Sequence, residues 1–197
     1  MSVITLAACN NGNDKVSQTV TTNTDTTQIT NTQDTSGNTA INVAPDTLKT
    51  PAKDNSIKEV VEHYLHIKNA LVKDDGKDAA SGGKQMAEAL AKVDKSHLSV
   101  EQKNVYEDLE ADAKEHAEHI SNNAAKINHQ REHFDMLSQD VYDLVKAFPA
   151  GQTLYRDHCP MYNDGKGAMW LSETREIKNP YYGKKMITCG SIKEAIK

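Results

Sequence analysis

The repeat of apolar side chains between residues 57 and 148 constrains the fold of this chain more than any other feature. In four successive stretches, apolar residues recur at spacings of three, four and seven, which keeps them on one face of an α-helix. Asp74-Asp75-Gly76 ends the first stretch, and Ser99-x-x-Gln102 has the form of a capping box before the third. We therefore predict four amphipathic helices with short connections, which is typical of an antiparallel up-and-down bundle.

The rest of the chain has no comparable period. Residues 10–55 contain no aromatic side chain and are rich in Thr, Asn, Asp and Ser, so we expect a disordered tether. Residues 151–197 hold the single Trp and four Tyr among turn-forming residues, which indicates a loop-rich extension closed by a short helix at 191–196. The predicted fold is all-α: a four-helix bundle at 56–150 with this extension packed on it as part of the same domain.

The first nine residues resemble the end of a bacterial lipoprotein signal. Leu6-Ala7-Ala8-Cys9 has the apolar and small residues that precede a lipidated cysteine, although the segment is shorter than a working signal peptide and lacks a positive start. We interpret 1–9 as a signal remnant with lipidation at Cys9. This predicts a protein anchored on the periplasmic face of the cell envelope, with the outer membrane as the expected location.

Two cysteines near the C-terminus each have a methionine close by in the sequence. Cys159 precedes Met161 by two residues, and Met186 precedes Cys189 by three. Thiolates and thioethers suit soft ions, so this pattern favours Cu(I) or Ag(I), with zinc as a further candidate. A disulfide between Cys159 and Cys189 is the alternative in an oxidising compartment, where it would stabilise the fold by roughly 3–4 kcal/mol. The sequence leaves both open.

Histidines provide a second set of candidate ligands. His129 and His133 lie four residues apart on the predicted fourth helix, so they share one face that a docked extension could reach. The pairs at 116/119 and 63/66 have looser three-residue spacing. Any such pair of histidines can simply lie at the edge of the apolar face of its helix, without a role in binding. The predicted metal ligands are therefore Cys159, Met161, Met186, Cys189, His129 and His133.

Other function classes have little support in the sequence. The zinc-protease motif, the nucleophile elbow, the phosphate loop and the dinucleotide fingerprint are all missing. The chain has no basic stretch interleaved with aromatic residues, which argues against nucleic-acid binding. A thiol oxidoreductase is the remaining enzyme hypothesis and would need a reactive cysteine. We expect no catalysed reaction.

Several segments resemble the DUF3347 family of domains of unknown function. They are QREHF at 130–134, LS at 137–138, CPM at 159–161, GAMWLS at 167–172, IKNPYYG at 177–183 and MITCG at 186–190. The resemblance extends over about residues 57–196. Members of this family occur alone behind lipoprotein signals and at the ends of membrane-fusion adaptors of Cus-type copper/silver efflux pumps. The resemblance therefore implies a role in heavy-metal handling in the periplasm.

These observations together predict a lipid-anchored protein that binds Cu(I) or a similar ion and passes it to, or senses it for, an efflux system. The expected partners are the metal ion, an efflux component and the membrane. The alternative is a structural or protein-interaction module in which the Cys159–Cys189 disulfide fastens the extension.

Overall fold

The structure is a computed structural model that describes residues 57–197. The predicted lipidation at Cys9, the signal remnant at 1–9 and the tether at 10–55 lie outside the described residues. Within the described region, no helix combines the length and the apolar character that crossing a bilayer requires.

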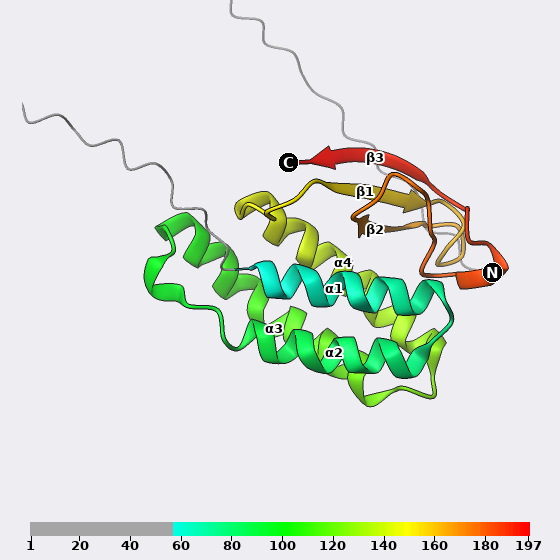
Figure 1. The fold of residues 1–197 in the computed structure, drawn as a ribbon, viewed down its shortest axis with the longest axis horizontal. Coiled ribbons are helices and arrows are strands. Elements are labelled where there is room, and N and C mark those ends of the chain that lie inside the picture. Colours follow the sequence, from blue (N-terminus) through cyan, green and yellow to red (C-terminus); the bar gives the residue numbers. More distant parts are fainter. Residues whose placement is uncertain (1–56) are drawn as a thin grey trace, which may run out of the picture. The chain divides into compact units, whose positions relative to one another are not determined.

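Four α-helices form the first part of the described region (Figure 1). They are α1 Lys58–Val72, α2 Gly76–Leu90, α3 Val100–Asn122 and α4 Ile127–Ala147, with a short 3₁₀ helix, η1, at Lys95–His97. Each α-helix packs against the next along the chain, and α1 also packs against α4. The four helices predicted from the apolar repeat are therefore present.

The helix boundaries follow from local capping interactions. The side chain of Asp75 accepts hydrogen bonds from the backbone N–H groups of Lys77 and Asp78 at the start of α2. At the start of α3, the Ser99 hydroxyl accepts from the backbone of Gln102, whose side chain accepts from the backbone of Ser99. This arrangement confirms the predicted capping box, which satisfies two backbone N–H groups that a helix start leaves unpaired.

Two glycines inside α2 allow its neighbours to approach closely. A Cβ atom on Gly83 would lie 2.6 Å from the backbone oxygen of Ala117 in α3. A Cβ atom on Gly82 would lie 2.9 Å from the Ile67 side chain in α1. The two glycines therefore let α2 pack closely against α1 on one side and α3 on the other.

The C-terminal extension contains a β-sheet, so the all-α prediction is wrong. Strands β1 Leu154–Cys159, β2 Ala168–Ser172 and β3 Ser191–Ile196 form an antiparallel sheet in the order β2-β1-β3. The segment 191–196, predicted as a short helix, is strand β3. A second 3₁₀ helix, η2, lies at Gly183–Lys185 between β2 and β3.

In β2, burial on both faces conceals the strand period in the sequence. Every residue of β2 is buried, so its apolar side chains do not alternate with polar ones. The connection from β1 to β2 passes through Asn163, Asp164 and Gly165, with φ angles of 53°, 54° and 81°. Such left-handed conformations suit a tight turn.

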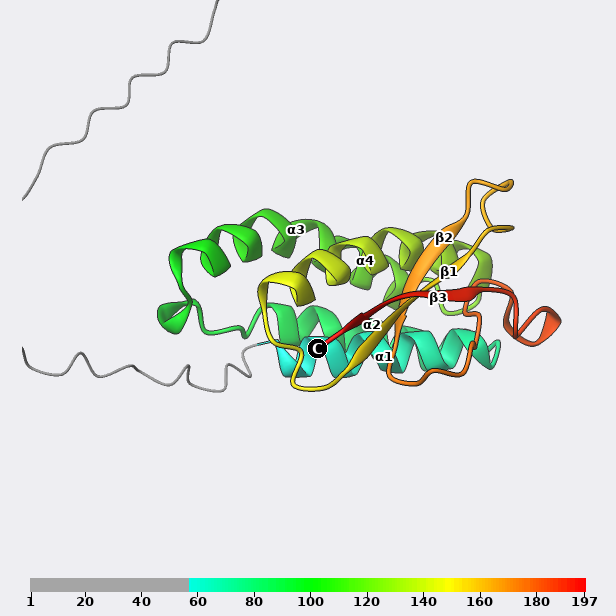
Figure 2. The same cartoon turned by 90° about the horizontal axis from the view of Figure 1, so that it is seen from above.

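The sheet packs on the side of the bundle formed by α1 and α4 (Figures 1 and 2). The buried Tyr64 hydroxyl of α1 accepts a hydrogen bond from the Leu171 backbone N–H at 2.9 Å and lies 2.8 Å from the Ser138 hydroxyl of α4. Trp170 and Tyr181 are also buried at this junction. The predicted packing of the extension on the bundle is therefore present, with a sheet as its framework.

Candidate metal centres

The two cysteines of the extension meet, although they are 30 residues apart in the sequence. Cys159 is buried at the end of β1, and Cys189 is half-buried just before β3. Their Sγ atoms lie 3.2 Å apart, and both are free thiols. The structure thus brings together the two thiols that the sequence singled out.

A network around Asn179 fixes the position of Cys189. The buried Asn179 side chain donates a hydrogen bond to the Cys189 carbonyl oxygen at 2.6 Å and accepts from the backbone N–H groups of Tyr181 and Tyr182. On the other side of Cys189, Gly190 packs so closely that a Cβ atom there would lie 2.8 Å from the Trp170 ring. The backbone that carries this thiol is therefore held in place before any ion binds.

The Cys189 thiol favours its protonated form. The hydrogen bond with Cys159 is the main cause that raises the pKa of the Cys189 thiol above its ordinary value, and burial adds to it. Because metal binding requires a thiolate, an ion would have to displace the proton of this thiol. The raised pKa also argues against a reactive, nucleophilic cysteine at this position.

The two predicted methionine ligands lie in different surroundings. Met161 is 53% exposed and lines a surface cleft of about 510 Å³ that also contains Met136, Glu132 and Asp135 of α4. Met186 is half-buried in the turn before Cys189, and its carbonyl oxygen accepts from the Cys189 backbone N–H. Met186 therefore belongs to the same turn as one thiol, whereas Met161 faces the cleft.

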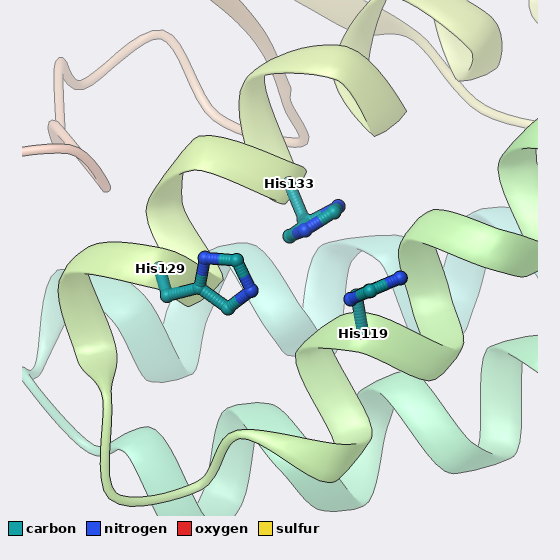
Figure 3. A group of neighbouring side chains, drawn as sticks. All are labelled: His119, His129 and His133. Atoms are coloured by element: carbon teal, nitrogen blue, oxygen red, sulfur yellow. The ribbon is translucent and has the colours of Figure 1, made fainter.

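The histidines form a separate group between α3 and α4 (Figure 3). His129 and His133 come from the first two turns of α4, and His119 comes from the last turn of α3. Each of these three half-buried residues offers a ligand atom within 4.8 Å of those of the other two. His116, one turn earlier in α3, extends the group, since its Nδ1 lies 3.2 Å from Nδ1 of His133.

The imidazole rings pack directly on one another. The rings of His119 and His133 stack with their centroids 4.2 Å apart and their planes 9° apart. The ring of His129 meets that of His133 edge-on at 4.6 Å. Figure 3 shows the three side chains pointing into the space between the two helices.

The surroundings keep part of this group neutral. Burial, followed by the charges of His119, His129 and His116, lowers the pKa of His133 to about 4. Burial likewise lowers the pKa of His116. A neutral imidazole has a free nitrogen lone pair, so these rings are suited to bind a metal ion at neutral pH.

The sequence identified half of this group. The four-residue spacing drew attention to His129 and His133, whereas His116 and His119 were set aside because of their looser spacing. The antiparallel α3–α4 hairpin provides a signal that could have found them. His119 and His129 lie nearly equally far from the loop that joins the helices, and so do His116 and His133. Such positions face one another across an antiparallel pair.

The fold and these clusters define the class of protein: a four-helix bundle carrying an antiparallel sheet, with two groups of candidate metal ligands. Residues 60–153 match the model of the family described as Protein of unknown function (DUF3347). This match confirms, over residues 60–153, the resemblance to that family that the motifs indicated. No curated protein and no solved structure matches the chain.

The family match includes one of the two groups of candidate ligands and leaves out the other. It covers the four helices and ends just before β1, so it contains the whole histidine group between α3 and α4 but neither Cys159 nor Cys189. The motifs quoted from 159 onward lie beyond the matched residues.

Proposed function

We propose that this protein binds a soft monovalent metal ion, Cu(I) foremost and Ag(I) second, and catalyses no reaction. The observation that supports the proposal most directly is the 3.2 Å separation of the Cys159 and Cys189 Sγ atoms. Cu(I) is a soft ion that prefers thiolate and thioether ligands. Two adjacent thiols in a partly buried position offer such ligands and limit the access of water.

The hydrogen bonds of Asn179 favour binding because the backbone that carries Cys189 is already ordered. Ordering a flexible loop on binding would cost free energy, and a site held in advance avoids much of that cost. The Sγ atoms must move apart to admit an ion, since each metal–sulfur bond is about 2.3 Å long. Met186, in the same turn as Cys189, is the thioether that we propose as a third ligand, and Met161 is the next candidate.

The proposed setting is the periplasmic face of the outer membrane, with Cys9 as the lipidated residue. The Leu6–Cys9 pattern supports this location, and the family resemblance supports a role beside a heavy-metal efflux system. In this setting the protein would pass Cu(I) to the efflux system or report its presence.

Titration of the reduced full chain with Cu(I) against a chromogenic chelator tests the proposal. We expect one equivalent to bind tightly, Cys189→Ser to weaken binding by about 100-fold or more, and Met186→Leu to weaken it less. Cys9→Ser removes a thiol outside the described region and serves as the matched control. Equal affinities for wild type and Cys189→Ser would contradict the proposal.

The second candidate is a structural or interaction module closed by a Cys159–Cys189 disulfide, which the short Sγ–Sγ separation also favours. Forming the bond releases two protons and passes two electrons to a disulfide oxidant, which becomes a dithiol. Counting alkylated thiols by mass spectrometry in protein isolated from its host separates the two functions. A stable disulfide, with weak Cu(I) binding after reduction, would favour the module.

A further inference from the structure

We propose that His119, His129 and His133 form a second metal site, independent of the two cysteines, for a divalent ion of the Zn(II) or Cu(II) class. Three imidazole nitrogens from two helices already converge within 4.8 Å. In a tetrahedral zinc site with Zn–N bonds of 2.0–2.1 Å, the ligand nitrogens lie about 3.4 Å apart. Small side-chain rotations would close the difference.

The hydrogen bonds of the rings direct specific nitrogens toward the ion. Nδ1 of His129 lies 3.0 Å from the carboxylate of Glu132. A carboxylate only accepts, so this nitrogen carries the proton, and in the neutral ring Nε2 keeps the lone pair for a metal. Metal-binding histidines in proteins commonly donate their other N–H group to a carboxylate in this way.

His133 has an equivalent partner in His116. Their Nδ1 atoms lie 3.2 Å apart, so one donates and the other accepts. When His133 donates, its Nε2 has the free lone pair, and His116 orients the ring without binding the ion. His116 is thus a positioning residue. On the third ring, Nε2 of His119 lies 3.7 Å from the Glu115 carboxylate, which adds a nearby negative charge.

The three histidine ligands lie on a rigid part of the fold. The buried Gln130 side chain, between the two α4 ligands, donates to the carbonyl oxygens of Ile120 in α3 and Gly76 in α2. These bonds fix the first turn of α4 against the end of α3. Sites on packed helices hold their ligands more accurately than sites on loops.

The ligand chemistry selects the ion. Imidazole nitrogen suits Zn(II), Cu(II) and Ni(II), whereas Mg²⁺ and Ca²⁺ prefer oxygen ligands. Three protein ligands leave a fourth position for water or a further group, which is the usual arrangement of an open zinc site.

Titration of the Cys159→Ser/Cys189→Ser chain with Zn(II), and with Co(II) as a spectroscopic probe, tests this site without interference from the Cys159 and Cys189 thiols. We expect one equivalent to bind, with Co(II) absorption bands of a nitrogen-rich site. His119→Gln and His133→Gln should each lower the affinity by about 100-fold or more. His97→Ala, which removes an imidazole that is 88% exposed outside the cluster, is the matched control.

Substitutions of His116 test its positioning role separately from the ligands. His116→Ala should lower the affinity for Zn(II) by about 10–100-fold, and His116→Asn, which can still accept a hydrogen bond, should restore part of it. Circular dichroism of each metal-free variant establishes that it is folded. In folded wild type, NMR of the imidazole nitrogens should show zinc-induced shifts at His119, His129 and His133.

Two outcomes would overturn this inference: Zn(II) affinity unchanged by His119→Gln and His133→Gln, or no stoichiometric Zn(II) binding by the Cys159→Ser/Cys189→Ser chain. The Cu(I) titration is read separately, since His119→Gln should leave Cu(I) binding intact. Failure of the histidine site can therefore be distinguished from failure of the thiol site.

Discussion

At the residue scale, the side chain of Asp157 is buried in the sheet at a cost in free energy. It is fully buried in β1, and neither carboxylate oxygen has a hydrogen-bond partner among the described residues. The Trp170 indole N–H also lacks a partner there. Burial raises the pKa of Asp157 to about 7, although the Lys68 charge opposes the shift. The charged form of Asp157 is therefore unfavourable in the folded protein.

The consequence is a stability that depends on pH. The folded pKa lies above the unfolded value of about 3.9, so this residue opposes folding least below pH 4 and increasingly as the pH rises to 7. We expect Asp157→Asn to raise the free energy of unfolding by about 2 kcal/mol at pH 8 and to change it little at pH 4. Urea unfolding at several pH values measures this, with the exposed Asp108→Asn as control. An equal effect at both pH values would contradict it.

At the element scale, the contact between α2 and α3 depends on the missing side chain of Gly83. Alanine there would gain about 1 kcal/mol of helix propensity. Its Cβ atom would also lie 2.6 Å from the Ala117 carbonyl oxygen and 3.0 Å from the Ser121 backbone nitrogen, both of which are rigid helix atoms. Overpacking of this kind costs about 1–3 kcal/mol.

We therefore expect Gly83→Ala to lower the free energy of unfolding by about 1 kcal/mol, in spite of its better helix propensity. Denaturant unfolding followed by circular dichroism measures the change. Ser81→Ala, on the exposed face of the same helix, is the control and should be neutral or slightly stabilising. A more stable Gly83→Ala protein would contradict this prediction, since it would show that α2 and α3 can move apart without a loss of stability.

The elements also show how far the sequence could predict the fold. The four helices were predictable because their period and caps are local, as at Ser99. Strand β3 was not, because its sequence is compatible with a helix and only pairing with β1, some 35 residues earlier, makes it a strand. The two cysteines were recognised from their residue type and His129 and His133 from their spacing, but the α3 histidines required knowledge of the helix pairing.

At the scale of the whole molecule, a partly buried ion pair joins the bundle to the extension. The Lys68 ammonium of α1, which is fully buried, donates to the Glu173 carboxylate at 2.6 Å, and Asn69 donates to its other oxygen at 2.9 Å. In this pair the positive charge belongs to the bundle and the negative charge to the extension.

We expect Glu173→Gln to lower the free energy of unfolding by about 2 kcal/mol, because Lys68 would remain buried without its counter-charge. Thermal and urea unfolding at neutral pH measure the loss. Glu176→Gln, a few residues further along the same loop and exposed, is the control and should change little. Equal stability of the two variants would show that the pair contributes nothing to docking.

The single tryptophan of the chain gives the thiol pair an optical reporter. Trp170 is buried, and its ring packs against Gly190, the residue that follows Cys189. Fluorescence of an indole responds to its immediate surroundings, so loading an ion on the thiols or oxidising them should change the emission of this one residue. The state of the extension can thus be followed in the unlabelled protein, in real time and at low concentration.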